Sequence, residues 1–496
     1  MVLPPWMTAR MLSTSALRFD AMSSDTLAVN ESPLREKENR WLWKADPVVC
    51  LYQEANLHRT RISAGVLMLN SAKPLDFDLF KEAFRILKRK AMNFRVCLRS
   101  SGDEQWFCEY DPGYVDVRVL DMDTNYIEAM ENSFREGFDS PDVPQWRVLL
   151  IPRSPDTPCA VPEIKEKYPY QYQYVIHPNH IFIDGTNTTL LMQAVVDILN
   201  DLISGKAVDE TTQYGIFTNN DGLREHEVNL EAMFKNYPLR LNKVIRELPP
   251  KDKKLWLQQV FPPPIDAEPG TRHVKRLLDP AVLARFQKKS KAAGVTFNSS
   301  FVSLINAAII DLLIEVGYVQ DKYSISVNHL VNLRRYLRKT EEFIQGAYNY
   351  PLSHTTDVSS SLKDNFWENI KEFHKDLHAR LKSGYLLEQK VAKKMTEPEI
   401  SPKEYFKNPP PVIHDFGVSN IGDISAICPG TGEHVQITDI MSLNTVHHYI
   451  HMDLHSIISY RGRSRYSLSY ATDYMSDEAA NILADKIMSL FEDLSK

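Results

Sequence analysis

The chain has few cysteines and no cysteine motif. Its 496 residues include five scattered cysteines without a CxxC pair. An odd number of cysteines cannot all be joined in disulfides, which favours a reducing compartment. The five are Cys50, Cys97, Cys108, Cys159 and Cys428, and none lies in a motif typical of a catalytic cysteine. We therefore expect a cytoplasmic protein.

An excess of one charge and a long hydrophobic run are also missing. The 58 basic and 64 acidic residues give a net charge of -6 without a block of one sign, which argues against a nucleic-acid partner. The most apolar stretch, Phe301 to Val319, is interrupted by Asn306, Asp311 and Glu315. It falls short of the ~20 uninterrupted apolar residues of a membrane span. This stretch is typical of a buried helix, and no transmembrane segment is expected.

The composition, 43% hydrophobic and 25% charged, is typical of a folded soluble protein with room for two or more cores. Residues 1–40 are interpreted as a disordered leader or a targeting segment. The first 19 residues contain Arg10 and Arg18, several Ser and Thr and no acid, which is compatible with a mitochondrial presequence. A mitochondrial location is therefore the alternative to the cytoplasm.

Two α/β lobes are predicted, an N-terminal lobe at residues 41–205 and a C-terminal lobe at 271–496. Residues 206–270 are punctuated by Asn219-Asn220-Asp221-Gly222 and Pro262-Pro263-Pro264, as expected of a linker. Strands are expected at residues 66–69, 147–151, 171–176 and 273–278, with a hairpin around Gly462. Helices are expected at residues 78–90, 188–202, 280–293 and 477–494.

One stretch carries readable chemistry. His180 lies four residues before Asp184-Gly185, directly after a predicted strand and before a predicted helix. Histidine is suited to take a proton near neutral pH, and a carboxylate followed by a conformationally free glycine fixes where the imidazole points. Gly185 is expected to permit this turn, and Thr186 to cap the helix. His180 is therefore the candidate general base.

An arginine in the second lobe is a candidate partner for this motif. If residues 323–336 are extended, their polar face carries Arg334. The other members of that face are Ser326, Asn328 and Asn332. A guanidinium is expensive to bury unless it is paired, and Asp184 would be a natural partner from the other lobe. The alternative is a strand edge that ends in exposed arginines.

Metal sites are less well supported. His177, His180 and Asp184 suggest two histidines and a carboxylate, but residues three apart in an extended chain face opposite ways. A second group of histidines has helical spacing but runs into the hairpin and lacks an HExxH glutamate. This group is His447, His448, His451 and His455. No metal is expected at either set of residues.

Three elements in order resemble the superfamily of CoA-dependent acyltransferases. They are HxxxDG at His180 to Gly185, Asn332-Leu333-Arg334, and Asp415-Phe-Gly417-Val-Ser419-Asn420-Ile-Gly422. The superfamily includes chloramphenicol acetyltransferase, plant BAHD enzymes, fungal alcohol acetyltransferases and condensation domains. Trp146-Arg147-Val148 and Tyr470 extend the resemblance to residues 45–494. It implies an α/β fold of two chloramphenicol-acetyltransferase-like lobes, each a mixed sheet with helices, with an active-site tunnel between them.

The chain also departs from individual branches. Condensation domains usually carry two adjacent histidines before xxxDG, whereas Asn179 stands first here. BAHD enzymes carry DFGWG, whereas Val418 and Ser419 occupy the last two positions. The small residues of this late stretch suit a strand whose backbone passes close to another group or ligand. The Ser-Asn-Ile-Gly form is closer to the alcohol acetyltransferase and condensation-like branches.

The resemblance implies an acyl-CoA-dependent O-acyltransferase that acts on a small-molecule alcohol, or an amine, as a monomer. His180 and Asp184 form the catalytic pair, although the family's aspartate pairs with an arginine, here Arg334, and does not touch substrate. Acyl-CoA is a co-substrate, and no bound cofactor is expected. Candidates to line the tunnel or hold the oxyanion are Asn179, Ser419 and Asn420. The alternatives are a freestanding condensation-type enzyme that uses carrier-protein thioesters and a non-catalytic binding protein of the same fold.

Overall fold

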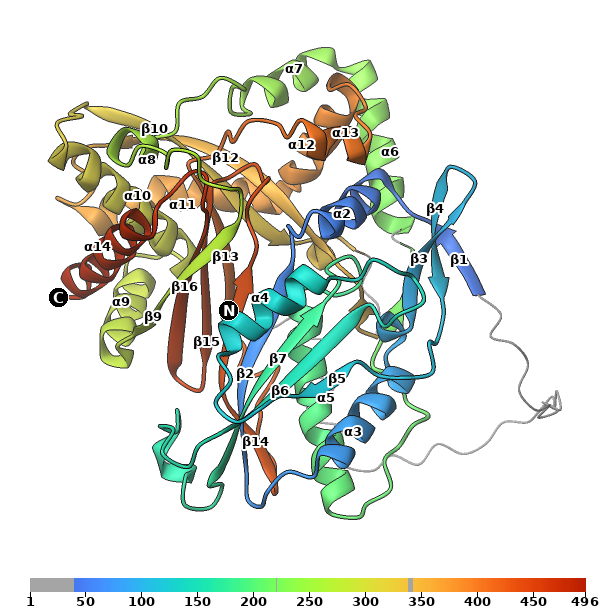
Figure 1. Cartoon of the computed structure of the whole chain (residues 1–496). Coiled ribbons are helices and arrows are strands. Elements are labelled where there is room, and N and C mark those ends of the chain that lie inside the picture. Colours follow the sequence, from blue (N-terminus) through green and yellow to red (C-terminus); the bar gives the residue numbers. More distant parts are fainter. Residues whose placement is uncertain (1–39, 220, 338–341) are drawn as a thin grey trace, which may run out of the picture.

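The computed structural model describes residues 40–219, 221–337 and 342–496. The predicted leader lies outside these ranges except for Arg40, which begins strand β1 (Arg40–Lys44). Two large sheets with their helices form two lobes, the five-stranded sheet at the lower right of Figure 1 and the six-stranded sheet at the left. The predicted mixed α/β class is confirmed.

The first lobe is built on a five-stranded sheet with helices on both faces. The strand order is β14 (Val435–Asn444), β2 (Ser63–Ser71), β7 (Tyr170–Pro178), β6 (Trp146–Arg153) and β5 (Val117–Val119). One face packs on α3 (Phe77–Lys90) and α5 (Gly185–Ile203), and the other on α4 (Tyr126–Glu136). Strand β7 illustrates how helices come to cover both faces of the sheet: Tyr174 and Ile176 pack towards α3 and α5, and Val175 packs towards α4. Alternate residues of a strand face opposite sides of the sheet, so a strand with apolar residues at every position is buried on both of its faces.

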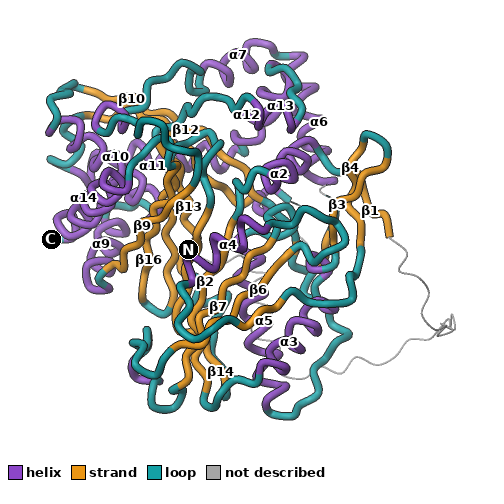
Figure 2. Tube along the Cα trace, in the orientation of Figure 1, coloured by secondary structure: helices purple, strands orange, loops and turns teal. Residues whose placement is uncertain are grey.

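The second lobe is a six-stranded sheet with helices against one face (Figure 2). Its order is β12 (Asn349–Ser359), β10 (Lys322–Asn332), β13 (Phe416–Asp423), β15 (Asp453–Tyr460), β16 (Arg463–Ala471) and β9 (Thr271–Leu278). The helices are α9 (Pro280–Ala292), α10 (Phe297–Glu315), α11 (Phe366–Ser383) and α14 (Asp477–Ser495). The predicted hairpin is β15–β16, and its turn at Arg461-Gly462 has a left-handed backbone at both residues.

Helix α10 corresponds to the buried helix predicted at residues 301–319, although it ends at Glu315 and leaves Val316 and Val319 exposed. Its N-cap is Thr296, whose side chain accepts a hydrogen bond from the Ser299 amide, and residues 299–313 are all buried. Among the described residues it is the one helix long and apolar enough to cross a membrane by length and composition, and 78% of the apolar window is buried inside the protein. Its packing is that of a core helix.

The prediction that all of residues 271–496 belong to the second lobe is wrong for strand β14. It pairs antiparallel with β2 and forms an edge of the first lobe's sheet. Its neighbours in sequence, β13 and β15, pair with each other in the second sheet. Ile437 contributes to the core beneath α3 and α5, and Leu443 to the core beneath α4. Burial on both faces of the first sheet holds the strand there.

The segment predicted as a linker contains regular structure. It holds β8 (Ile216–Phe217), α6 (Asp221–Asn236), α7 (Pro238–Arg246) and α8 (Leu257–Val260). Helices α6 and α7 pack on α12 (Tyr385–Thr396) in a third apolar cluster, at the top of Figure 1. Pro238 occupies the first turn of α7, a position where proline favours a helix.

The remaining elements are short. Strands β1, β4 (Glu104–Glu109) and β3 (Val96–Ser101) form a small sheet, and β8 pairs with β11 (Ile344–Gln345). Helices α2 (Pro47–Leu57) and α13 (Pro402–Lys407) lie close together. The short 3₁₀ helices are η1 (Met92–Phe94), η2 (Pro162–Ile164) and η3 (Leu333–Tyr336).

Candidate active site

His180 lies in the turn between the end of β7 and the start of α5. Its Nδ1 is 2.9 Å from the Ile183 carbonyl oxygen. Because a carbonyl can only accept, Nδ1 carries the proton and Nε2 carries the lone pair. Nε2 makes no hydrogen bond to the residues that the structure describes. Burial lowers the pKa of His180, against the opposing effects of the Ile183 carbonyl and Asp184. The imidazole is therefore a neutral base at pH 7.

Asp184 holds the turn and does not face the imidazole's free nitrogen. It is the N-cap of α5, and its Oδ1 accepts from the Asn187 amide at 3.0 Å. Its Oδ2 accepts from the Tyr348 amide at 2.9 Å and from Arg334 Nη1 at 2.6 Å. Both oxygens are thus occupied, so the structure gives Asp184 a positioning role rather than a catalytic one. The cap is Asp184 and not Thr186.

Arg334 and Asp184 form a buried ion pair, with side-chain exposures of 7% and 6%. The guanidinium also donates to the carbonyls of Ile344 and Gly346, each at 2.8 Å, and to Asn187 Oδ1 at 2.7 Å. Arg334 lies in η3, after the end of β10, rather than on an exposed strand edge. All three of its nitrogens have partners, so it fastens the segment after β10 to the start of α5.

Gly185 differs from the prediction. It is the first residue of α5, and its backbone is not in the left-handed region. An added Cβ would lie 3.7 Å from Ile421 Cδ1, an ordinary contact. The turn at His180 therefore does not depend on a glycine conformation, and Gly185 marks the place where β13 passes the start of α5.

Asn179 is a buried structural residue. Its Oδ1 accepts from Asn56 Nδ2 at 2.9 Å and from the Ile181 amide at 3.2 Å, while its Nδ2 donates to Gln145 Oε1 at 3.1 Å. With its amide used in this way, Asn179 is not a free donor for an oxyanion. It fixes the end of β7 against α2.

The late glycine-containing stretch forms β13 and approaches another group closely, as predicted. That group is His451: a Cβ on Gly417 would lie 2.8 Å from its Nε2. Asn420 Oδ1 accepts from the Gly422 amide at 3.0 Å, at an irregularity in the β13–β15 pairing where Gly422 has a left-handed φ of 81°. The Ser419 hydroxyl makes no hydrogen bond within the described ranges.

Asp415, at the start of the same stretch, has a partner that the sequence did not reveal. It is fully buried and forms an ion pair of 2.8 Å with Lys253. Its carboxylate also accepts from the amides of Ser326 at 2.8 Å and Trp256 at 3.0 Å. Asp415 therefore anchors the segment before α8 to β10, and its partner Lys253 lies in the segment predicted as a linker.

Three of the histidines considered as metal ligands have other partners. His177 Nδ1 lies 2.8 Å from Ser133 Oγ, and His447 Nδ1 lies 2.9 Å from Thr271 Oγ1. His455 Nδ1 lies 2.8 Å from Tyr466 Oη. Within the described ranges no three histidine, cysteine or acidic side chains gather as a metal site would require.

An aromatic cluster beside His180 was missed by sequence reasoning. The ring of Tyr52 meets the His180 ring edge-on, with 6.0 Å between centroids. Tyr52 also contacts Arg61, whose Cζ lies 5.4 Å from the Tyr52 centroid. Arg61 also lies over the rings of Tyr405, Phe406 and Tyr449. These residues come from four separate segments, so no local pattern could have joined them.

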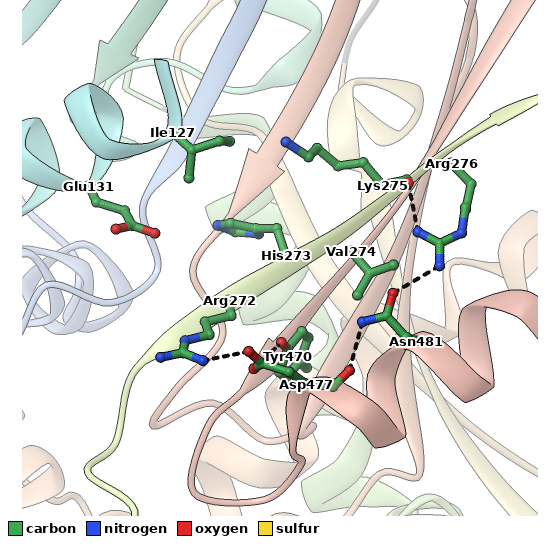
Figure 3. Close-up of a pocket in the computed structure, with 10 residues that line it drawn as sticks. All are labelled: Ile127, Glu131, Arg272, His273, Val274, Lys275, Arg276, Tyr470, Asp477 and Asn481. Atoms are coloured by element: carbon green, nitrogen blue, oxygen red, sulfur yellow. Dashed lines mark hydrogen bonds and ion pairs between the residues drawn. The ribbon is translucent and has the colours of Figure 1, made fainter. Parts of the chain in front are cut away.

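A cavity of ≈ 420 Å³ lies between α4 of the first lobe and β9, β16 and α14 of the second (Figure 3). None of the site residues predicted from the sequence lines it. Of its cations, Arg272 pairs with Asp477 at 2.6 Å and Arg276 with Asp485 at 2.8 Å.

Comparison with known proteins supports the fold. No protein-family model and no curated protein matches the chain. Among solved structures, the trichothecene 15-O-acetyltransferase TRI3 of Fusarium sporotrichioides has a TM-score of 0.66 at 12% identity, covering 92% of this chain and 95% of that one. The first condensation domain of the CDA synthetase has a TM-score of 0.65 at 13% identity, covering 92% and 96%. Polyketide synthase associated protein 5 of Mycobacterium tuberculosis has 0.61 at 13%, covering 92% and 99%.

The chain thus has the fold of this O-acetyltransferase and this condensation domain. Near-complete coverage in both directions excludes a match to one lobe alone, while identities this low establish the fold and not the reaction.

Proposed function

We propose that the protein transfers an acyl group from acyl-CoA to the hydroxyl of a small molecule, with amines as possible acceptors. The observation that carries this proposal is the arrangement of His180, whose Nδ1 is committed to the Ile183 carbonyl while Nε2 is left as a free base. The hydrogen bond at Nδ1 fixes the orientation of the ring and therefore of Nε2. Proton transfer from an acceptor bound beside Nε2 then takes place within one complex and needs no collision with a base from solution.

The reaction needs no covalent enzyme intermediate. Nε2 takes the hydroxyl proton as the acceptor oxygen attacks the thioester carbonyl, which gives a tetrahedral oxyanion. Collapse of this intermediate breaks the C–S bond, and His180 returns the proton to the leaving thiolate. A positioned base of this kind contributes ~10²–10⁴-fold.

Two side chains remain as candidate oxyanion donors. The Ser419 hydroxyl and the Asn420 amide nitrogen make no hydrogen bonds within the described part of the chain, whereas the Asn179 nitrogen is bonded to Gln145. Donors aimed at the developing oxyanion lower the barrier because the site does not have to reorganise.

The test is thiol release from a panel of short and medium acyl-CoAs in the presence of simple alcohols and amines, with products identified by mass spectrometry. His180→Ala should abolish acceptor-dependent release while leaving CoA binding intact. His226, which is exposed on α6, supplies a control variant, His226→Ala, with unchanged activity. Release by His180→Ala within tenfold of the parent would refute the assignment of the base.

A second candidate is a freestanding condensation-type enzyme whose donor is a carrier-protein thioester. This candidate is supported by the similarity to a condensation domain, whose TM-score of 0.65 is nearly the same as the 0.66 of the acetyltransferase. An acylated carrier protein belongs in the same panel. Product from that donor alone would favour this candidate, and no product from either donor would favour a non-catalytic binding protein.

A further inference from the structure

Two arginines in the loop between α2 and β2 differ in their partners. Arg59 and Arg61 both have left-handed backbones, with φ of 57° and 55°. Arg59 forms a two-pronged ion pair with Asp139, at 2.7 and 2.8 Å. Arg61 pairs with no carboxylate among the described residues, and within them its side chain donates one hydrogen bond, from Nη2 to the Tyr405 hydroxyl at 2.7 Å. The two arginines thus share a backbone conformation but not an anionic partner.

The surroundings of Arg61 leave its charge without an anion. Its Cζ lies 5.2 Å from the ring centre of Tyr405, 5.8 Å from that of Phe406 and 4.7 Å from that of Tyr449. Its Nε is sealed from solvent without a hydrogen-bond partner. Burial raises the pKa of the Tyr449 phenol well above its usual range, so this neighbour stays neutral. Ring faces attract a cation, but they do not satisfy the donors of a guanidinium.

The guanidinium also lies near the candidate base. Tyr52 contacts both groups: its ring centre is 6.0 Å from the His180 ring centre and 5.4 Å from Arg61 Cζ, so Arg61 Cζ is at most 11.4 Å from the His180 ring centre. The two groups therefore lie within the span of one small molecule. An unpaired guanidinium with fixed geometry is matched best by a carboxylate, which accepts two parallel hydrogen bonds.

We infer that one of the two reactants carries a carboxylate, which binds Arg61 beside the aromatic rings of Tyr52, Tyr405 and Tyr449. This inference rests on the proposed acyl transfer at His180. The carboxylate belongs either to the acyl group, as in a dicarboxylic acyl-CoA, or to the acceptor, as in a hydroxy acid. Both sources share one chemistry, and substrate pairs distinguish them.

The test compares matched substrates that differ only in charge. In the donor arm, kcat/KM for malonyl-CoA and succinyl-CoA is compared with that for acetyl-CoA and butyryl-CoA. In the acceptor arm, 3-hydroxybutyrate and 4-hydroxybenzoate are compared with their methyl esters. We expect one arm to favour the acid by about 30-fold or more, the factor equivalent to 2 kcal/mol, at the lower end for losing a buried hydrogen-bonded charge pair.

Arg61→Met should remove that preference, so that kcat/KM for the acid falls to the level of its neutral counterpart. Arg61→Lys keeps the charge and should retain part of the preference, while Tyr405→Phe removes a hydrogen bond to the guanidinium and should raise KM for the acid. Arg285, exposed on α9 and outside the site, supplies the control Arg285→Met, which should match the parent.

Calorimetric binding of the same acids to the His180→Ala variant separates this inference from the proposed reaction. Acid binding that depends on Arg61 supports the carboxylate site even if no acyl transfer is found. The inference is overturned if the parent shows no preference in either arm, or if Arg61→Met lowers turnover of acidic and neutral substrates equally. Failure of both turnover and Arg61-dependent binding also overturns it.

Discussion

The buried pair of Asp184 and Arg334 allows a sharp test of what holds the candidate base in place. Both side chains are more than nine-tenths buried, so removing one charge strands the other in a low-dielectric interior. Such a loss costs about 3–5 kcal/mol. Asp184→Asn keeps the shape of the side chain but leaves Arg334 without an anion. Arg334→Met has the additional effect of freeing the carbonyls of Ile344 and Gly346.

We would measure the free energy of unfolding of both single variants and the double variant by urea denaturation. Each single variant should lose about 3–5 kcal/mol. The double variant should lose less than the sum by up to ~3 kcal/mol, because neither charge is then left alone. If the losses of the two single variants sum to the loss of the double variant within ~0.5 kcal/mol, the pairing is refuted. The half-exposed pair of Arg85 and Glu82 is the control, and its coupling should be small because solvent screens it.

Three other predictions follow from the site. Since burial lowers the pKa of His180, its active neutral form persists at pH 7, and kcat/KM should fall only as the pH drops below the ordinary histidine pKa of about 6.5; an acid limb above that value would contradict the geometry. Gly417→Ala places a methyl group against the His451 ring and should cost about 1–3 kcal/mol of stability in a thermal melt, with an unchanged melting temperature as the contrary result. Lys253→Met strands the buried Asp415 carboxylate and should cost about 3–5 kcal/mol, whereas Lys254→Met, next in sequence, should be close to neutral by the same measurement.

The sequence predicted those features that short stretches of the chain encode by themselves. Alternation and helical spacing located the strands and helices around His180, and a buried arginine after a strand suggested a carboxylate partner. The roles of amides could not be read in the same way. Asn179 and Asn420 have the same chemistry whether they bind a reactant or satisfy a backbone group, and only their partners decide between these roles. Arg61 escaped notice because its four aromatic neighbours lie up to nearly 400 residues away in the chain and no periodic pattern links them.

Strand β14 sets the order in which the protein can be completed during synthesis. The other four strands of the first lobe's sheet are translated by residue 178, but their edge partner spans residues 435–444. Until that late strand leaves the ribosome, β2 presents an unpaired edge, which is a template for aggregation. Domains usually fold as units, N-terminal first, yet here the first lobe has to wait for most of the second. A fragment that ends after residue 205 should therefore be insoluble, whereas co-expression with residues 206–496 should rescue it by supplying the missing edge in trans.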